Sequence, residues 1–211
     1  MNDPKAAGRF ITIEGIEGVG KSTNVSFIAD YFTARGDVVQ VTREPGGTAI
    51  AERIRNLILE TPGDGLSNTA ELLLMFAARA EHLAKLIRPA LERGETVICD
   101  RFTDATFAYQ GSGRGLDKAV IAALQDIVQG ELRPDLTILL DAPPNISAER
   151  IAGRGWRDRF EQEQAEFFAR VRAGYLEIAA NEADRVTVID ASQPLEAVQA
   201  AILEALNLIC K

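Results

Sequence analysis

The chain has 211 residues, of which 46% are hydrophobic, so it is long enough to enclose one full core and is expected to form a single domain. Its formal net charge of −8 and sequence pI near 4.8 argue against a nucleic-acid-binding surface, because such surfaces usually carry a basic excess. One histidine and two widely separated cysteines provide almost no ligands for a zinc cluster.

Residues 1–9 hold no long apolar segment, and we expect them to form a short mobile tail rather than a signal peptide or a membrane anchor. The remaining residues, 10–211, are expected to be one domain in the cytoplasm, with no membrane partner. Cys99 lies within the apolar run TVIC and is far from Cys210 in sequence, so a buried thiol is favoured over a disulfide bridge. The single histidine, His82, is expected to be a half-exposed helix residue.

The stretch GIEGVGKS at 15–22 joins an apolar run that predicts a strand (10–14) to apolar residues at helical spacing from Lys21 to about Arg35. It fits the GxxxxGK[ST] pattern, in which backbone N–H groups surround phosphate oxygens, the lysine reaches the terminal phosphates and the hydroxyl binds magnesium. The N-terminus of the helix then points at the anion. The sequence therefore predicts a nucleoside triphosphate site. Its expected residues are Gly15, Ile16, Glu17, Gly18, Val19, Gly20, Lys21, Ser22 and Thr23.

Five short apolar runs, rich in β-branched residues or leucine, alternate with helical patterns along the chain. They occupy 10–14, 38–42, 96–100, 136–141 and 186–190. Strands that are apolar throughout and alternate with helices predict a parallel sheet covered on both faces. We therefore expect a doubly wound, five-stranded α/β domain of the P-loop NTPase type.

Three further segments carry local signals. Residues 69–93 keep leucine and phenylalanine at helical intervals up to a glycine stop signal, which predicts one long helix. Residues 194–209 predict an amphipathic C-terminal helix with proline near its start. GSGRG at 111–115 lacks the preceding strand of a dinucleotide fingerprint, so we expect a mobile connection there.

Polar residues follow two of the strands at the sheet edge where ligands of open parallel sheets bind. Arg43 lies in TREPGG after the second strand, and Arg101 lies in DRF after the third. Because the planar guanidinium group matches phosphate oxygens in pairs, these two arginines are expected to hold a second phosphate that faces the triphosphate. Asp100 and Asp141 both end strands and compete for the role of the carboxylate near magnesium. Asp100 is favoured because it adjoins Arg101.

The segment RIAGRGWRDRFE at 150–161 clusters arginines around two glycines. Glycine joints with clustered arginines favour a lid that closes over the triphosphate and neutralises charge during transfer. The alternative interpretation is a solvated charged turn.

In this order, GIEGVGKS, TREPGGT, LLLMFAAR, DRFTDATFAYQG and GRGWRDRFEQE resemble the successive motifs of bacterial-type thymidylate kinases, over a span from about Phe10 to the C-terminus. The resemblance implies Mg²⁺-dependent transfer of the γ-phosphoryl group of ATP to dTMP, giving dTDP and ADP for dTTP synthesis, by a homodimer. An acceptor phosphate is already anionic at neutral pH, so this reaction needs positioning and charge neutralisation rather than a strong general base. The alternatives are a kinase of another (deoxy)nucleoside monophosphate and a non-kinase, ATP-binding regulatory protein.

The resemblance also implies roles for single residues. In the family a phenylalanine of the long helix stacks on the thymine and an arginine one turn on bonds to its carbonyl, which here leaves either Met75 or Phe76 to accompany Arg79. Tyr109 is expected under the deoxyribose, where its bulk would exclude a ribose hydroxyl. The implied dTMP-binding residues are Glu17, Arg43, Phe76, Arg79, Arg101, Thr106, Tyr109 and Gln110. The implied catalytic residues are Lys21, Asp100, Arg101, Arg154 and Arg159, with Ser22 and Asp100 at the magnesium ion, directly or through water.

Overall fold

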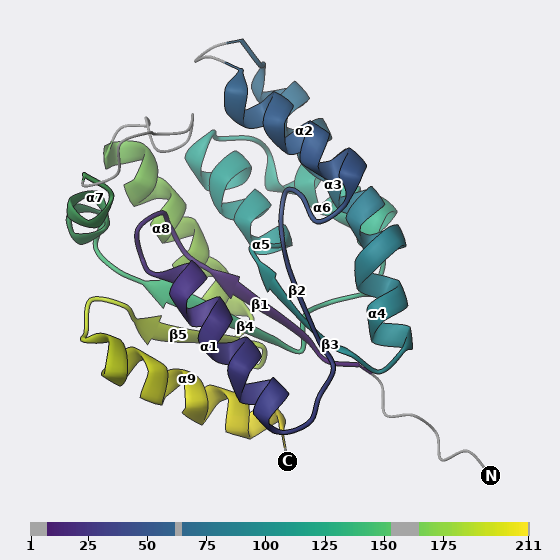
Figure 1. The fold of residues 1–211 in the computed structure, drawn as a ribbon. Helices are drawn as coiled ribbons and strands as arrows, with labels where there is room; N and C mark the ends of the chain where they lie inside the picture. Colours follow the sequence, from purple (N-terminus) through teal and green to yellow (C-terminus); the bar gives the residue numbers. More distant parts are fainter. Residues whose placement is uncertain (1–7, 62–64, 153–164, 211) are drawn as a thin grey trace.

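The computed structural model describes residues 8–61, 65–152 and 165–210 (Figure 1). Within these ranges, strands form one sheet in the order β2-β3-β1-β4-β5, and every neighbouring pair is parallel. The strands are β1 (Phe10–Glu14), β2 (Val39–Arg43), β3 (Thr96–Asp100), β4 (Leu136–Asp141) and β5 (Val186–Asp190). The expected doubly wound parallel sheet is confirmed, and the second strand differs from its expected bounds by one residue.

The three central strands β3, β1 and β4 are buried along nearly their whole length. Apolar side chains such as Ile11, Ile98 and Ile138 are fully enclosed, because helices cover both faces of the sheet at this point. Polar side chains in these strands have partners, as the hydroxyl groups of Thr12 and Thr137 show by lying 2.7 Å apart on neighbouring strands. The edge strands β2 and β5 keep several exposed residues.

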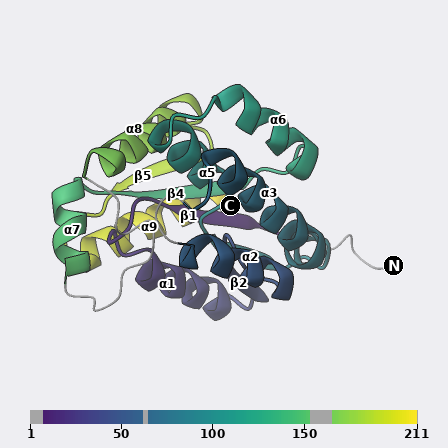
Figure 2. The ribbon, with the colours of Figure 1, turned by 90° about the horizontal axis from the view of Figure 1, so that it is seen from above.

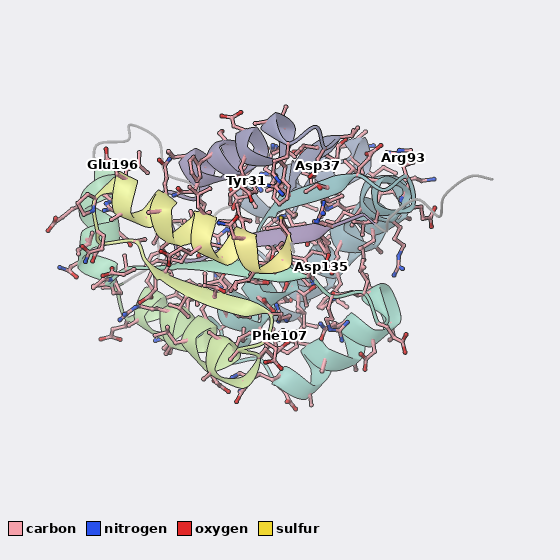
Figure 3. The ribbon with its side chains drawn as sticks, turned by 90° about the horizontal axis from the view of Figure 1, so that it is seen from below. Tyr31, Asp37, Arg93, Phe107, Asp135 and Glu196 are labelled. Carbon is pink, nitrogen blue, oxygen red and sulfur yellow. The ribbon has the colours of Figure 1, made fainter. Side chains whose placement is uncertain are left out.

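Helices pack on both faces of the sheet (Figure 2). Helices α1 (Lys21–Ala34) and α9 (Leu195–Ile209) lie on one face, where α1 contacts β1, β2 and β3 and α9 contacts β4 and β5. Helices α4 (Arg88–Glu92) and α8 (Ala165–Asn181) contact the sheet from the opposite face. Figure 3, seen from below, shows the pale green α8 on the side of the sheet away from the yellow α9. None of the helices in the described parts of the chain combines the length and the apolar character needed to cross a bilayer.

Besides the long helix expected at 69–93, the structure has another helix between β2 and β3 that was not expected from the sequence. This helix, α2 (Ala49–Glu60), begins where the hydroxyl of Thr48 accepts a hydrogen bond from the N–H of Ala51 at 3.2 Å. It packs against α3 (Asn68–His82), which in turn contacts α6 (Lys118–Gln129). The three helices therefore pack side by side in the order α2, α3, α6 and form a helical wall.

The long helix expected at 69–93 is present as three consecutive segments. After α3 the chain forms a π-helical segment, η1 (Leu83–Ile87), and then continues into α4. A wider π turn inside a helix is common near functional sites, and it has no reliable sequence signal.

The connection expected to be mobile at 111–115 is largely helical and packed. Its first part belongs to η2 (Phe107–Gly113), which follows the short helix α5 (Thr103–Thr106) and lies against α8. A Cβ added to Gly113 would lie 2.7 Å from the ring of Phe167, and one on Gly174 would collide with the side chain of Ser112. These glycines are needed for the close approach of η2 and α8, which the sequence alone did not reveal.

Most of the expected mobile tail, residues 1–7 of 1–9, lies outside the described residues. Its last two residues are tied to the domain. The N–H of Gly8 donates to the carbonyl of Leu91 at 3.1 Å, and the carbonyl of Arg9 accepts from Val97 at 2.7 Å.

Candidate active site

The phosphate loop joins β1 to α1 at the carboxyl edge of the sheet. Gly15, Gly18 and Gly20 have φ angles of +133°, +80° and +89°, which residues with a Cβ rarely adopt. A Cβ on Gly15 would also collide with the carbonyl oxygen of Leu140 in β4. Gly20 is the N-cap of α1, whose first-turn N–H groups lack partners inside the helix and are suited to bind an anion.

The side chain of Lys21 closes this loop. Its Nζ donates to the carbonyl oxygens of Gly15 at 3.1 Å and Ile16 at 2.8 Å. Burial of the ammonium group, followed by the nearby charge of Arg101, lowers the pKa of Lys21 to about 8. A bound polyphosphate would raise the pKa of Lys21 again, because a nearby anion favours the protonated form.

A cavity of about 270 Å³ opens beside the loop. Of the residues expected from the sequence, it is lined by Glu17, Gly18, Gly20, Lys21, Ser22, Thr23, Arg79, Asp100, Arg101, Thr106, Tyr109 and Gln110. The residues that line it and were not expected are Glu44, Pro45, Arg55, Leu59, Phe102 and Ala105. Gly15, Ile16 and Val19 are not among the described lining residues, and the side chains of Ile16 and Val19 belong to the core.

An acidic residue of the loop organises one wall of the cavity. Glu17 accepts from Nη2 of Arg101 at 2.7 Å through one oxygen and from the hydroxyl of Tyr109 at 2.6 Å through the other. Burial alone would raise the pKa of Glu17, but the charges of Arg101 and Lys21 outweigh it and hold the pKa below its usual value. The guanidinium group of Arg101 also lies 4.8 Å from the ring centroid of Tyr109. Arg101 is thus fixed in the cavity wall, and its φ of +68° is a left-handed backbone conformation that is uncommon for a residue other than glycine.

Arg79 enters the cavity from α3. Its Nε donates to Glu44 at 2.7 Å, and its Nη2 donates to the carbonyl of Phe102 at 3.1 Å and to the hydroxyl of Thr106 at 3.0 Å. Its Nη1 is buried and has no hydrogen-bond partner among the described residues. A buried donor without a partner is costly, so the arrangement suits a ligand that supplies an acceptor.

The two candidates for the ring contact are placed differently. Met75 lines the cavity, whereas Phe76 does not appear among the described lining residues. Phe76 is 2% exposed and packs with Leu72 and Ile121, and its ring lies 4.9 Å from the guanidinium carbon of Arg79. The structure therefore gives Phe76 a place behind Arg79 and leaves Met75 facing the cavity, because consecutive helix residues point about 100° apart.

Arg43 was expected in the cavity and Arg55 was not, but the structure shows the reverse. Arg43 is not among the described residues that line the cavity; its Nη2 pairs with Glu52 at 2.9 Å at an exposed position. Arg55 on α2 lines the cavity instead, and its Nη1 donates to the carbonyl of Pro45 at 2.9 Å. The sequence reasoning missed Arg55 because it missed α2.

The two competing aspartates are also separated. Asp141 is held by Arg172 of α8 through two hydrogen bonds of 2.7 Å each. Asp100 lines the cavity, and its Oδ1 is buried without a hydrogen-bond partner in the described part of the chain. A carboxylate oxygen with an unused lone pair beside Ser22 fits Mg²⁺, which usually takes one or two protein ligands together with water and substrate phosphates.

The expected lid arginines Arg154 and Arg159 lie outside the described residues, as does Trp156. Of 150–161, only 150–152 are described, at the end of α7 (Pro144–Ala152). Arg150 donates from Nη1 to the carbonyl of Ala191 at 3.0 Å, which holds this residue against the loop after β5.

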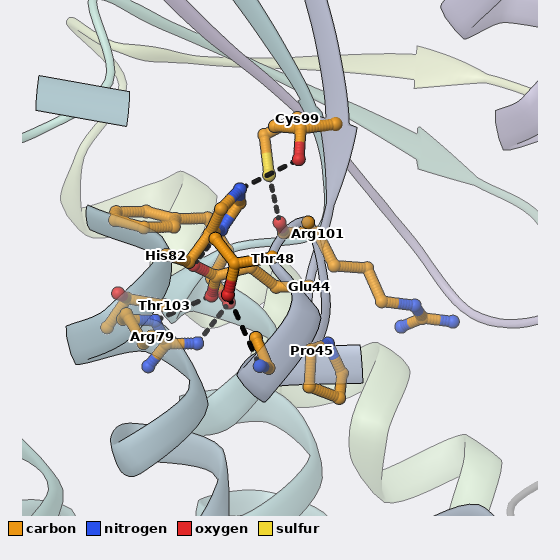
Figure 4. A network of polar contacts seen from close by, with 12 residues as sticks. Glu44, Pro45, Thr48, Arg79, His82, Cys99, Arg101 and Thr103 are labelled. Carbon is orange, nitrogen blue, oxygen red and sulfur yellow. Dashed lines mark hydrogen bonds and ion pairs between the residues drawn. The ribbon is translucent and has the colours of Figure 1, made fainter. Parts of the chain in front are cut away.

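His82 was expected to be half-exposed, and that expectation is wrong. Its side chain is fully buried, and its Nδ1 lies 3.0 Å from Glu44 (Figure 4). Its Nε2 lies 2.7 Å from the hydroxyl of Thr42 in β2. Cys99 is buried and free, as expected, and Cys210 is also free.

The fold and the cavity together define a P-loop nucleotide-binding protein of the α/β class, in which Arg55, Arg79 and Arg101 line the same cavity as the phosphate loop. The family model described as thymidylate kinase matches residues 13–202. The thymidylate kinase of Chromohalobacter salexigens is 61% identical over 197 residues, covering 92% of this chain and 93% of that protein. That of Pseudomonas syringae pv. tomato is 57% identical over 195 residues, with 92% of this chain and 93% of the relative covered.

A solved structure of thymidylate kinase from Ehrlichia chaffeensis superposes with a TM-score of 0.77 at 36% identity, covering 95% of this chain and 99% of that one. The chain belongs to the thymidylate kinase family, and it is therefore a phosphotransferase.

Proposed function

We propose that the protein transfers the γ-phosphoryl group of ATP to dTMP, giving dTDP and ADP. The observation that carries this proposal is one cavity that is lined both by the phosphate loop, with Lys21, and by the arginines Arg55, Arg79 and Arg101. A donor phosphate at the first and an acceptor phosphate at the second would meet in line.

At the donor end, the loop and the start of α1 would hold the ATP phosphates, with Lys21 on the terminal groups. Ser22 and Asp100 would hold Mg²⁺, directly or through water. When bound, the ion supplies charge neutralisation at the transferring phosphoryl group. The residues from Gly15 to Thr23 supply the backbone donors and the hydroxyls for this cradle.

At the acceptor end, Arg101 and Arg55 are the cations that would hold the dTMP phosphate. Both line the cavity, and guanidinium groups bind phosphate oxygens in pairs. Because the guanidinium group of Arg43 is paired with Glu52, we propose that Arg43 acts on the dTMP phosphate only by long-range electrostatic attraction.

The base would lie against Met75, between Arg79 and Gln110. The unpartnered Nη1 of Arg79 is a donor, and the amide nitrogen of Gln110 is committed to Glu71 at 2.9 Å, so the group that Gln110 offers a ligand is its carbonyl oxygen. A donor beside an acceptor matches a ring with a carbonyl next to an N–H, as in thymine. Cytosine would instead present an amino donor to the donor of Arg79.

Tyr109 would pack under the deoxyribose with Glu17 beside it, and Thr106 would support Arg79 at the base. From the family resemblance we also propose that Arg154 and Arg159 neutralise charge during transfer. No residue needs to act as a strong base, because the acceptor phosphate is already anionic.

The test is ADP formation with ATP, Mg²⁺ and each deoxy- and ribonucleoside monophosphate in turn. We expect dTMP to give the highest kcat/KM, dCMP to be disfavoured by at least about tenfold, and chelation of Mg²⁺ to abolish turnover. If another nucleoside monophosphate gives the highest kcat/KM, that nucleotide is the acceptor and the proposal of dTMP is wrong. ATP binding without acceptor-dependent formation of ADP would support a regulatory protein.

We further propose that the protein acts as a homodimer in the cytoplasm. Support for the dimer comes from large apolar side chains exposed on the helical wall α2, α3 and α6. They are Ile50, Leu57, Leu73, Val120 and Ile127. A second copy packed on this face would bury them, and sedimentation equilibrium of the purified protein would show twice the chain mass.

A further inference from the structure

A chain of buried hydrogen bonds runs from β2 to the cavity through the histidine. Thr42 contacts Nε2 of His82 at 2.7 Å, Nδ1 of His82 lies 3.0 Å from one oxygen of Glu44, and the other oxygen of Glu44 accepts from Nε of Arg79 at 2.7 Å. Figure 4 draws His82, Glu44 and Arg79 in one cluster. Of these four residues only Glu44 and Arg79 line the cavity, so His82 and Thr42 stand behind them.

The direction of each hydrogen bond follows from the groups involved. Arg79 can only donate, and Glu44, as a carboxylate, accepts from both neighbours, so Nδ1 of His82 carries a proton. The hydroxyl of Thr42 lies within hydrogen-bond distance of Nε2 and can serve it as donor or acceptor. The ring of His82 is 0% exposed, so water has no access to it, and Glu44 is 4% exposed and meets the cavity only at its edge.

These hydrogen bonds allow the carboxylate of Glu44 only one orientation. Both of its oxygens are engaged, one by His82 and one by Arg79, and a turn of the carboxylate would break one of the two bonds. Arg79 is held on its other side by Phe102 and Thr106. The direction of the remaining nitrogen, Nη1, is therefore set by the whole network rather than by Arg79 alone.

The surroundings hold the ring in place as well. Gly47 lies against the His82 ring with a φ of +85°, and a Cβ there would collide with Nε2 and lie 2.5 Å from the hydroxyl of Thr42. The TREPGG segment thus encloses the ring from one side while α3 carries it on the other. A ring enclosed in this way cannot turn to exchange its nitrogens.

We propose that His82 is a positioning residue for acceptor recognition, which through its Nδ1 proton orients Glu44 and so aims Arg79 at the base of the nucleoside monophosphate. This inference rests on the proposed function, and it adds a determinant that has no contact with the substrate. Its loss weakens acceptor binding selectively and leaves the ATP site, on the other side of the cavity, unaffected.

The test compares two replacements of nearly equal shape. Asparagine places an amide N–H where Nδ1 lies, and leucine places a methyl group there, so His82→Asn and His82→Leu differ mainly in the donor toward Glu44. Leu83→Ala is the matched control, because it removes buried apolar volume from the next residue and has no bond to the network. Steady-state kinetics with ATP and dTMP, calorimetric dTMP binding and thermal unfolding are measured for all four proteins.

We expect His82→Leu to raise the KM and the Kd for dTMP about tenfold, which is the weakening of one hydrogen bond to a charged group, with the KM for ATP within about twofold of wild type. His82→Asn should restore dTMP binding to within about threefold. Leu83→Ala should lower the unfolding temperature without raising the KM for dTMP. Equal dTMP affinity in the leucine and asparagine variants, or parallel losses for ATP and dTMP, would overturn the inference.

If His82→Leu does not fold, the pair Thr42→Val and Thr42→Ser decides the matter, since valine keeps the shape of threonine and serine keeps its hydroxyl. A raised KM for dTMP in the valine variant alone supports the inference, and wild-type values in both overturn it. The wild-type protein is assayed first. Absence of dTMP turnover there refutes the proposed function, whereas turnover with unaffected variants refutes only the role of His82.

Discussion

Replacement of Glu14 by glutamine is expected to change how the stability of the protein depends on pH. Glu14 ends β1 immediately before the phosphate loop and is fully buried. One of its oxygens accepts from the N–H of Phe102 at 2.6 Å, and the other from the hydroxyl of Tyr175 at 2.8 Å. Burial, followed by the negative charge of Asp104, raises the pKa of Glu14 from 4.5 to about 8.

The sign and the size of the effect follow from this pKa. Between pH 4.5 and about 8 the folded protein keeps the proton that the unfolded chain has lost, so the free energy of unfolding falls as the pH rises through this window. The stabilisation is fully present below pH 4.5 and is lost once the pH passes about 8. The span of about 3.5 pH units, 8 minus 4.5, corresponds to about 5 kcal/mol at roughly 1.4 kcal/mol per unit. Glutamine resembles the protonated carboxyl and does not titrate.

Urea denaturation followed by circular dichroism at pH 5, 6, 7, 8 and 9 measures this loss for wild type and Glu14→Gln. Subtracting the two series removes the titration of all other groups, and we expect the stability of the variant relative to wild type to rise by about 4 kcal/mol between pH 5 and pH 9, because this range covers most but not all of the window between 4.5 and about 8. A difference that stays constant over the whole range would refute the claim that the buried carboxyl retains its proton.

Gly15→Ala is expected to abolish ATP binding in calorimetry, since the added Cβ meets a backbone carbonyl and the φ of +133° is unfavourable for alanine; undiminished ATP affinity would contradict the loop geometry. Arg55→Ala should raise the KM for dTMP about tenfold or more, whereas Arg43→Ala should change it less than about twofold, and the opposite ranking would return the acceptor phosphate to Arg43. Met75→Ala should raise the KM for dTMP, while Phe76→Leu should chiefly lower the unfolding temperature; kinetics and thermal scans that show the reverse would place Phe76 at the base.

Local sequence signals predicted the structure correctly where a chemical requirement is met by residues that are close together in the sequence. The spacing of Gly15, Gly20, Lys21 and Ser22 predicted the strand, loop and helix that the structure contains. The β-branched runs predicted five parallel strands, because a strand buried on both faces must be apolar throughout. The family motifs further placed Arg79, Arg101 and Tyr109 in one cavity.

The errors arose where distant segments meet. His82 was expected to be half-exposed because its partners, Thr42 and Glu44, lie about forty residues earlier, and their pairing depends on how α3 packs on β2. Gly113 looked like a mobile joint because the close approach of α8 is invisible in the local pattern.

The sequence by itself determined the fold class, the triphosphate loop and the chemical kind of residues in the acceptor compartment, since each depends on short-range spacing or on a motif. Only the tertiary structure showed that Met75 rather than Phe76 and Arg55 rather than Arg43 line the cavity, and that Asp141 is paired with Arg172 while Asp100 faces the cavity. Each choice depends on a direction in space, set by helix rotation or by a competing ion pair, and neighbouring residues of one helix differ in direction by about 100°.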